Sequence, residues 1–157
     1  VAEQKRLIVA YNKEEKGWPI EIVEGDYEPE RFYEMAKGYE NCPEGGERCF
    51  RCFDLRLRRT AELAADGGYD YFATTLTISP LKNAAKINEI GQQLSEELEV
   101  PFLPSDFKKK NGYKRSVELS KEYDLYRQDY CGCIFSKAER ETQKNDDCSH
   151  SSSTSEQ

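Results

Sequence analysis

The chain of 157 residues is long enough to bury the core of one domain. It is 37% hydrophobic and 11% aromatic, which excludes wholesale disorder. The net charge of -7 argues against a generally basic nucleic-acid binder, although it leaves room for a local basic patch. The sequence has neither an apolar run long enough for a membrane span nor a signal-peptide pattern at its start. Six cysteines in such a chain indicate metal or redox chemistry in the cytoplasm rather than a disulfide scaffold.

Local patterns predict alternating helices and strands. Apolar residues at helical spacing predict helices over residues 2–15, 30–37, 48–66, 83–98 and 116–123. Short β-branched and aromatic runs predict strands over residues 20–23, 69–75 and 100–103. Gly67 and Gly68 are expected to end the third helix, and Ser79-Pro80 lies where the fourth would be capped.

This alternation predicts an α/β fold with a parallel sheet and a C-terminal helical segment. Ligands then gather beyond the carboxyl ends of the strands, where residues 74–83 and 104–113 fall. A helix comes first, only three strands follow, and the only methionine is Met35. We therefore expect the first strand to be missing and the N-terminus to be incomplete.

The domain is expected to cover residues 1–140, followed by a disordered polar tail over residues 141–157. The tail holds five serines and two threonines with almost nothing apolar. Cys148 and His150 within it are expected to be incidental. Because His150 is the only histidine, chemistry based on histidine is excluded, and thiols, carboxylates, tyrosines or a cofactor must do the work.

The first candidate site is the C-x-x-C pair, Cys49 and Cys52, at the start of the third predicted helix. Side chains three residues apart share one helix face, so the two sulfurs can bind one ion or cluster. Exposed amides and the positive end of the helix dipole favour thiolates there. Two buried structural cysteines are the alternative.

The second candidate site is the C-x-C pair, Cys131 and Cys133, with Gly132 between them. A disulfide across one residue closes a tight ring, and glycine tolerates the dihedral angles that the ring needs. Such a bond is strained and easily reduced, which favours a two-electron store. A zinc site made by both cysteine pairs is the alternative.

Basic residues gather twice in this acidic chain, over residues 48–59 and 108–115. Cations with neighbouring aromatic rings are typical of RNA-loop recognition. The candidates for tRNA contact are Lys108, Lys109, Lys110, Lys114, Arg115, Tyr126 and Arg127. A solvated charged face is the alternative.

Four blocks, in this order, closely resemble the QueH type of epoxyqueuosine reductase, and the resemblance runs from the first helix to about Arg140. The blocks are Glu44–Cys52 (EGGERCFRC), Thr74–Lys82 (TTLTISPLK), Asp106–Lys109 (DFKK) and Tyr126–Cys133 (YRQDYCGC). The resemblance implies a Rossmann-like sheet of the adenine-nucleotide alpha hydrolase kind. It also implies the last step of queuosine biosynthesis, the reduction of epoxyqueuosine to queuosine at the tRNA wobble position by an oxidoreductase.

The same resemblance implies a 4Fe-4S cluster held by four cysteines, two of which match Cys49 and Cys52, and a redox-active disulfide that matches the C-x-C pair. The other two ligands in such enzymes are adjacent cysteines at the end of an opening strand, which this sequence lacks, and Cys42 is not expected to replace them.

We hypothesise that iron held partly by the C-x-x-C pair polarises the epoxide and that the C-x-C pair relays electrons from an external donor. Asp106 and Asp129 are candidates for a ligand of an additional iron or for a proton donor. Two other functions stay open: a tRNA-binding fragment without catalysis, and a structural zinc-binding protein.

Overall fold

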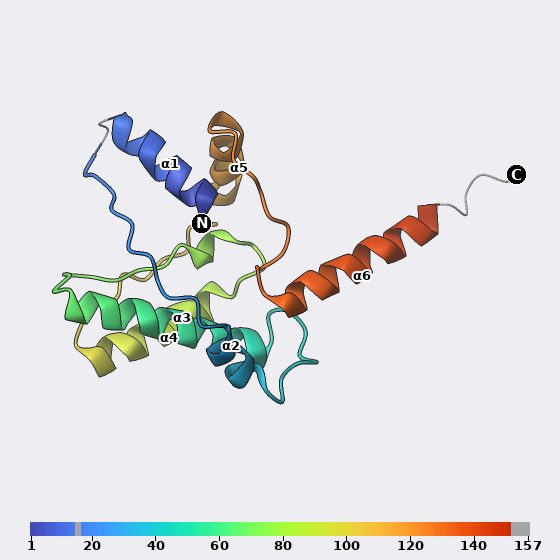
Figure 1. The fold of residues 1–157 in the computed structure, drawn as a ribbon, viewed down its shortest axis with the longest axis horizontal. Coiled ribbons are helices and arrows are strands. Elements are labelled where there is room, and N and C mark those ends of the chain that lie inside the picture. The colour runs from blue at the N-terminus through green and yellow to red at the C-terminus, as the bar shows by residue number, and fades with distance from the viewer. Residues whose placement is uncertain (15–16, 152–157) are drawn as a thin grey trace, which may run out of the picture. The chain divides into compact units, whose positions relative to one another are not determined.

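The structure is a computed structural model that describes residues 1–14 and 17–151, with side chains up to Lys144. Its elements in chain order are α1 (Ala2–Lys13), α2 (Pro29–Ala36), α3 (Glu47–Asp66), the short 3-10 helix η1 (Leu76–Ile78), α4 (Ala84–Leu98), α5 (Gly112–Glu122) and α6 (Ile134–Ser151), as drawn in Figure 1. The chain divides into two compact units, Val1–Leu125 and Tyr126–Gln157. No helix in the described ranges combines the length and the apolar character needed to cross a membrane.

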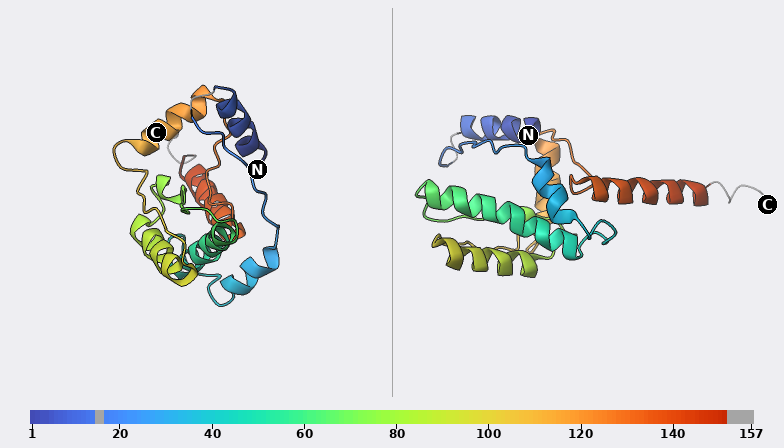
Figure 2. Two further views of the ribbon diagram at one scale, coloured as in Figure 1. Left: turned by 90° about the vertical axis from the view of Figure 1, so that its left-hand side faces the viewer. Right: turned by 60° about the horizontal axis from the view of Figure 1, so that its bottom comes forward.

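The core of the first unit lies between α3 and α4, which run side by side in Figures 1 and 2. The apolar stripe of α3 supplies Phe53, Leu57, Ala61 and Ala64, and that of α4 supplies Ile87, Ile90 and Leu94. These stripes have the period of an α-helix, so burying them against each other is the main hydrophobic gain available to this chain.

Phe72 and Phe102 complete the core, with their ring centroids 5.0 Å apart. Helix α4 approaches Phe102 at Gly91, where an added β-carbon would lie 2.5 Å from the ring. The absence of a side chain at Gly91 therefore permits this close contact between helix and ring.

The sequence predicts a parallel sheet of the Rossmann-like, adenine-nucleotide alpha hydrolase kind. For the described residues this prediction is wrong. The structure is helical, and the segments predicted as strands contain one isolated parallel bridge, between Phe72 and Phe102. The Phe72 N–H donates to the Pro101 carbonyl (2.9 Å), and the Leu103 N–H donates to the Phe72 carbonyl (2.9 Å). Residues 20–23 form no strand at all.

The hydrogen-bonding pattern of a parallel sheet does not continue beyond this single bridge. On one side, the next donor would be the nitrogen of Pro101, which carries no hydrogen. On the other side, the pattern would need the Thr74 N–H and then the Ser105 N–H as donors, and the Ser105 N–H donates instead to Asn88 Oδ1 (3.1 Å). The Asn88 Nδ2 also donates to the Ser105 carbonyl (2.9 Å), so α4 holds the chain where a strand would have continued.

The predicted helices of the first unit are confirmed, with shifts at their ends. Helix α4 is capped by Asn83, whose side chain accepts the Lys86 N–H, rather than at Ser79. Helix α5 begins at Gly112, four residues earlier than predicted. Residue 15, the last of the first predicted helix, lies outside the described residues.

The second unit contains α6, which runs to Ser151 and so continues past Glu141, where the sequence predicts an irregular tail. Glu, Gln and Lys favour helix, and a contact between Lys137 and Glu141 (3.9 Å) joins side chains one turn apart. The last part of the predicted tail, residues 152–157, lies outside the described residues. The side chains of Cys148 and His150 also lie outside them.

Candidate redox and metal-binding cysteines

Cys49 lies in the first turn of α3 and Cys52 in the second, and the helix follows an extended residue, Gly46, at its N-cap. Cys49 is buried, Cys52 is half-buried, and neither forms a disulfide. The Gly45 N–H donates to Cys49 Sγ at 3.3 Å, and Gly45 can point its amide this way because its φ of 89° is accessible to glycine. The sulfur of Cys49 therefore has a hydrogen-bond donor in the loop that precedes α3.

A buried ion pair holds the loop that contains Gly45. Lys82 Nζ lies 2.7 Å from Glu44 Oε1, and the two side chains are only 6% and 23% exposed. The Lys82 ammonium also lies 6.0 Å from the centre of the Phe53 ring. Since Glu44 precedes Gly45 directly, the ion pair fixes the peptide whose amide meets Cys49.

Arg48 ties the same helix start to the chain before it. Its guanidinium is 2% exposed and donates to the carbonyls of Tyr39 (3.3 Å) and Glu40 (2.7 Å). This arginine, which the sequence placed in a basic cluster, is therefore part of the interior of the fold.

The residues present fit a metal cluster only in part. The C-x-x-C pair offers two sulfurs on one helix face, but within the described side chains no group of three or more His, Cys, Asp or Glu residues is placed to bind a metal ion. A 4Fe-4S cluster takes four thiolates. This part of the chain therefore supplies half of the expected ligands.

The C-x-C pair lies in the second unit, at the start of α6. Cys131 and Cys133 are half-buried free thiols and form no disulfide. The Ser136 N–H donates to Cys133 Sγ (3.3 Å), so this sulfur takes the position of an N-cap acceptor, three residues before its donor. In return, Ser136 Oγ accepts the Cys131 N–H (3.0 Å).

Gly132 makes the tight turn between the two cysteines. Its φ is 92°, in the left-handed region that favours glycine, as the sequence predicts. Gln128 Nε2 donates to the Tyr130 carbonyl (2.8 Å) and would lie 3.3 Å from a β-carbon at position 132. Glycine is therefore favoured at position 132 by its positive φ and by the limited space for a β-carbon.

Asp106 lies among lysines in the first unit. Its Oδ1 is 3.3 Å from Lys108 Nζ and its Oδ2 is 3.4 Å from Lys109 Nζ. The Oδ1 atom is buried and makes no hydrogen bond within the described part of the chain. Lys108 also donates to the Lys82 carbonyl (3.2 Å), which joins this acidic residue to the loop of the buried ion pair.

Asp129, in the second unit, is held by two cations of α6. Its Oδ2 lies 2.7 Å from Lys144 Nζ and 3.8 Å from Arg140 Nε. The hydrogen bond from Lys144 is the main reason why the pKa of Asp129 is lowered. A carboxyl group with a lowered pKa is ionised at neutral pH, so Asp129 is suited to accept a proton or bind a cation rather than to donate a proton.

The predicted tRNA-binding residues of the first unit differ in how far their charges are already used. Arg115 pairs with Glu118 (3.5 Å) and Glu122 (3.7 Å), and Lys108 and Lys109 share Asp106. Lys110 and Lys114 are exposed on the same stretch of chain. Tyr126 and Arg127 are exposed in the second unit.

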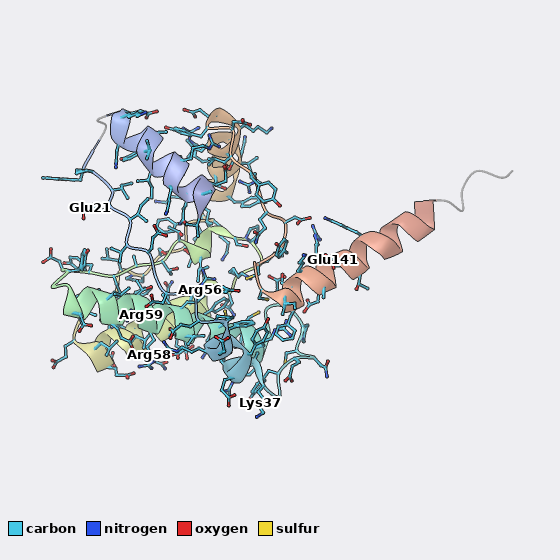
Figure 3. All side chains as sticks on the ribbon, in the orientation of Figure 1. Glu21, Lys37, Arg56, Arg58, Arg59 and Glu141 are labelled. Carbon is cyan, nitrogen blue, oxygen red and sulfur yellow. The ribbon has the colours of Figure 1, made fainter. Side chains whose placement is uncertain are left out.

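The arginines along α3 in Figure 3 serve mostly intramolecular contacts. Arg58 lies 2.5 Å from Glu97 on α4, and this partner lowers the pKa of the Glu97 carboxyl. Arg59 lies 3.7 Å from Glu62. Arg56 is exposed and makes no ion pair within the described residues, so it is the α3 arginine best placed to meet an anion in solution.

Sequence reasoning gave no role to three residues that support the cysteines: Glu44, Lys82 and Ser136. Ser136 carries no capping-box signal, because that pattern has Ser or Thr at the N-cap and Glu or Gln three residues later, whereas Cys133 and Ser136 take these positions here. The pair of Glu44 and Lys82 carries no local signal, since the two residues are 38 positions apart.

The structure thus has one cysteine pair at the start of α3 and a second directly before α6. The family model "Epoxyqueuosine reductase QueH" matches residues 2–139. Relatives described as epoxyqueuosine reductase QueH include one from Streptococcus pyogenes, 50% identical over 76% of this chain and 47% of its own length. Others come from Staphylococcus epidermidis (45% identical, over 84% of this chain and 56% of the relative) and Thermotoga maritima (38%, over 89% and 74%).

The chain therefore belongs to the epoxyqueuosine reductase QueH family. It spans about half the length of the first two of these relatives.

Proposed function

We propose that this chain reduces epoxyqueuosine to queuosine in tRNA, as an oxidoreductase of the cytoplasm and in the last step of queuosine biosynthesis. The observation that carries the proposal is the family match over residues 2–139, a range that includes both cysteine pairs. The match also covers the basic stretch at residues 108–115.

The C-x-C pair is proposed as the source of electrons. Conversion of an epoxide to an alkene breaks two C–O bonds, forms one C=C bond and releases water, which takes two electrons and two protons. Oxidation of the Cys131 and Cys133 thiols to a disulfide supplies both, and an external dithiol or protein reductant then restores the thiols. The free thiols and the glycine turn between them support this role.

The C-x-x-C pair is proposed to provide two ligands of a 4Fe-4S cluster. The Gly45 amide at Cys49 Sγ supports this role, because N–H donors to cluster sulfurs tune iron–sulfur centres. A bound cluster would supply one-electron chemistry. Since the described residues gather only two ligands, the electron pair in this proposal comes from the C-x-C pair alone.

The tRNA is proposed to contact the exposed cations of the first unit, chiefly Lys109, Lys110 and Lys114, with Tyr126 and Arg127 as further contacts. Phosphates attract such cations regardless of sequence, and rings stack on unpaired bases. Asp106 is proposed as a ligand of an additional iron or as a proton donor, and Asp129, being ionised, as a ligand.

The test incubates this chain, anaerobically and with iron, sulfide and a reductant, with tRNA that carries epoxyqueuosine. Digestion of the tRNA and mass spectrometry of its nucleosides then measure queuosine. We expect queuosine from the unmodified chain and none from Cys131→Ser or Cys133→Ser. Cys42→Ser is the matched control and should retain activity, because Cys42 belongs to neither pair.

A tRNA-binding role without catalysis is the second candidate, and the exposed cations Lys109, Lys110 and Lys114 favour it. If the chain binds this tRNA but forms no queuosine under these conditions, the binding role replaces the catalytic one. If it does neither, both proposals are wrong.

A further inference from the structure

Ser136 contacts both members of the C-x-C pair. Its N–H donates to Cys133 Sγ at 3.3 Å, and its hydroxyl oxygen accepts the Cys131 N–H at 3.0 Å. The residue is only 2% exposed, although serine usually lies at the surface. Ser136 therefore binds the backbone of Cys131 through its buried hydroxyl and the sulfur of Cys133 through its amide. Capping a helix requires fewer contacts than these.

We propose that Ser136 is a positioning residue that stabilises the dithiol form of the C-x-C pair and thereby sets its reduction potential. The proposal rests on the redox role assigned to this pair above. It concerns the equilibrium between dithiol and disulfide and requires neither tRNA nor a cluster.

The two hydrogen bonds are made while the sulfurs are free. The hydroxyl fixes the backbone at Cys131, and the amide fixes the sulfur of Cys133 at the first turn of α6. Closing a disulfide across Gly132 requires a specific arrangement of both sulfurs and the backbone between them. The anchors at Ser136 oppose that rearrangement, so they favour the reduced pair.

Removal of the hydroxyl should therefore favour the disulfide. A net hydrogen bond in a protein corresponds to about a fivefold change in an equilibrium constant. We expect Ser136→Ala to shift the oxidation equilibrium about fivefold toward the disulfide. Ser136→Thr keeps a hydroxyl at this position and should restore the original value.

The experiment equilibrates the whole chain with reduced and oxidised glutathione at a series of ratios. Each oxidised pair arises as the S–S bond of glutathione disulfide breaks and the Cys131–Cys133 bond forms. The electron pair and the two thiol hydrogens pass to two molecules of glutathione. The reaction is stopped with acid, and the free thiols are alkylated.

Trypsin cleaves after Arg127 and Lys137, which releases residues 128–137 as one peptide. That peptide contains both cysteines of the pair and Ser136 but no other cysteine. Its mass separates the disulfide from the doubly alkylated form, so the fraction oxidised is measured for this pair alone. Hydrogen exchange at the Cys131 amide provides a second readout and should become faster in Ser136→Ala.

Thr142→Ala is the matched control, because it also removes a hydroxyl from α6 that bonds to backbone, here the Ala138 carbonyl (3.1 Å). It should leave the equilibrium unchanged. If Ser136→Ala has the same midpoint as the unmodified chain, or if Thr142→Ala shifts equally, the inference is wrong. If the unmodified pair forms no disulfide at any glutathione ratio, the proposed redox role is wrong, and the role of Ser136 that rests on it is wrong as well.

Discussion

Replacing Lys82 with methionine tests whether the buried ion pair holds the loop beside Cys49. Methionine keeps most of the length and apolar stem of lysine but removes the ammonium group that lies 2.7 Å from Glu44. The change leaves a carboxylate with 23% of its side chain exposed and without the cation that faces it. The free energy of unfolding should fall.

The size of the effect follows from burial. Removal of one partner from a buried ion pair costs about 3–5 kcal/mol, and the residual exposure of Glu44 places this case near the lower end, at about 3 kcal/mol. In a chain of this size, each kcal/mol corresponds to roughly 2–4 °C in Tm, so a decrease of about 6–12 °C is expected. The double variant Glu44→Gln with Lys82→Met should be more stable than the sum of the single changes predicts.

Urea unfolding of the two single variants and the double variant, followed by circular dichroism, measures this cycle. Lys86→Met is the matched control, because Lys86 pairs with Glu89 at 2.6 Å on the surface, with side chains 33% and 51% exposed. It should cost less than about 1 kcal/mol. The Gly45 amide should also exchange faster with solvent in Lys82→Met than in the control.

Single changes that add without coupling would show that Glu44 and Lys82 do not stabilise each other. A cost of Lys82→Met no larger than that of Lys86→Met would show that burial makes no difference to the ion pair.

Three further predictions address packing, the end of the ladder and the charge on α6. Gly91→Ala should lower the free energy of unfolding, measured in urea, by about 1–3 kcal/mol, because the added methyl meets the Phe102 ring. Phe102→Leu should relieve part of that loss. Equal losses with and without Phe102→Leu would contradict this. Asn88→Ala should lower the free energy of unfolding by about 2 kcal/mol in the same assay, because it leaves the N–H and the carbonyl of Ser105 without this partner. An unchanged midpoint would show that water replaces the Asn88 amide. Lys144→Gln should raise the pKa of Asp129 toward its usual value of about 3.9, measured by carbon NMR of the carboxyl group. Because the pKa of Asp129 is lowered in the folded chain, its contact with Lys144 stabilises α6 above about pH 4, and this stabilisation is lost on acidification. An unchanged titration of Asp129 in Lys144→Gln would exclude Lys144 as the cause.

The helices could be predicted from the sequence because their signals are local. The apolar stripe of α3 repeats at helical spacing from Phe53 to Ala64, and Gly67 follows its last residue. In the first unit only the ends of the helices moved, whereas α6 in the second unit continues past Glu141 into the predicted tail. Capping depends on single side chains such as Asn83, which competes with Ser79 for the same role.

The sheet could not be excluded from the sequence because strand pairing depends on distant partners. Residues 69–75 and 100–103 do have strand-like composition, and they do meet in parallel at Phe72. Pro101 cannot donate the next hydrogen bond on one side, and on the other side Asn88 binds the backbone groups of Ser105 that a longer pairing would use. The second of these joins residues from two different elements, which composition does not reveal.

The cysteine pairs could be found from spacing alone, and the C-x-x-C pair lies at the start of α3, as predicted. The side chains that support them could not. Glu44 and Lys82 meet through the fold, and the basic cluster that composition suggested on α3 includes Arg48, which is buried. Composition counts charges, whereas the fold decides which of them face solvent.

The arrangement around Cys133 also bears on how this protein folds. The hydrogen bonds of Cys131 and Cys133 given above both involve Ser136, which lies only a few residues further along the chain. Loops of about ten residues close in roughly 10–100 ns, far faster than the long-range packing of two helices such as α3 and α4. These two hydrogen bonds can therefore form early in folding, before the core of the first unit has formed.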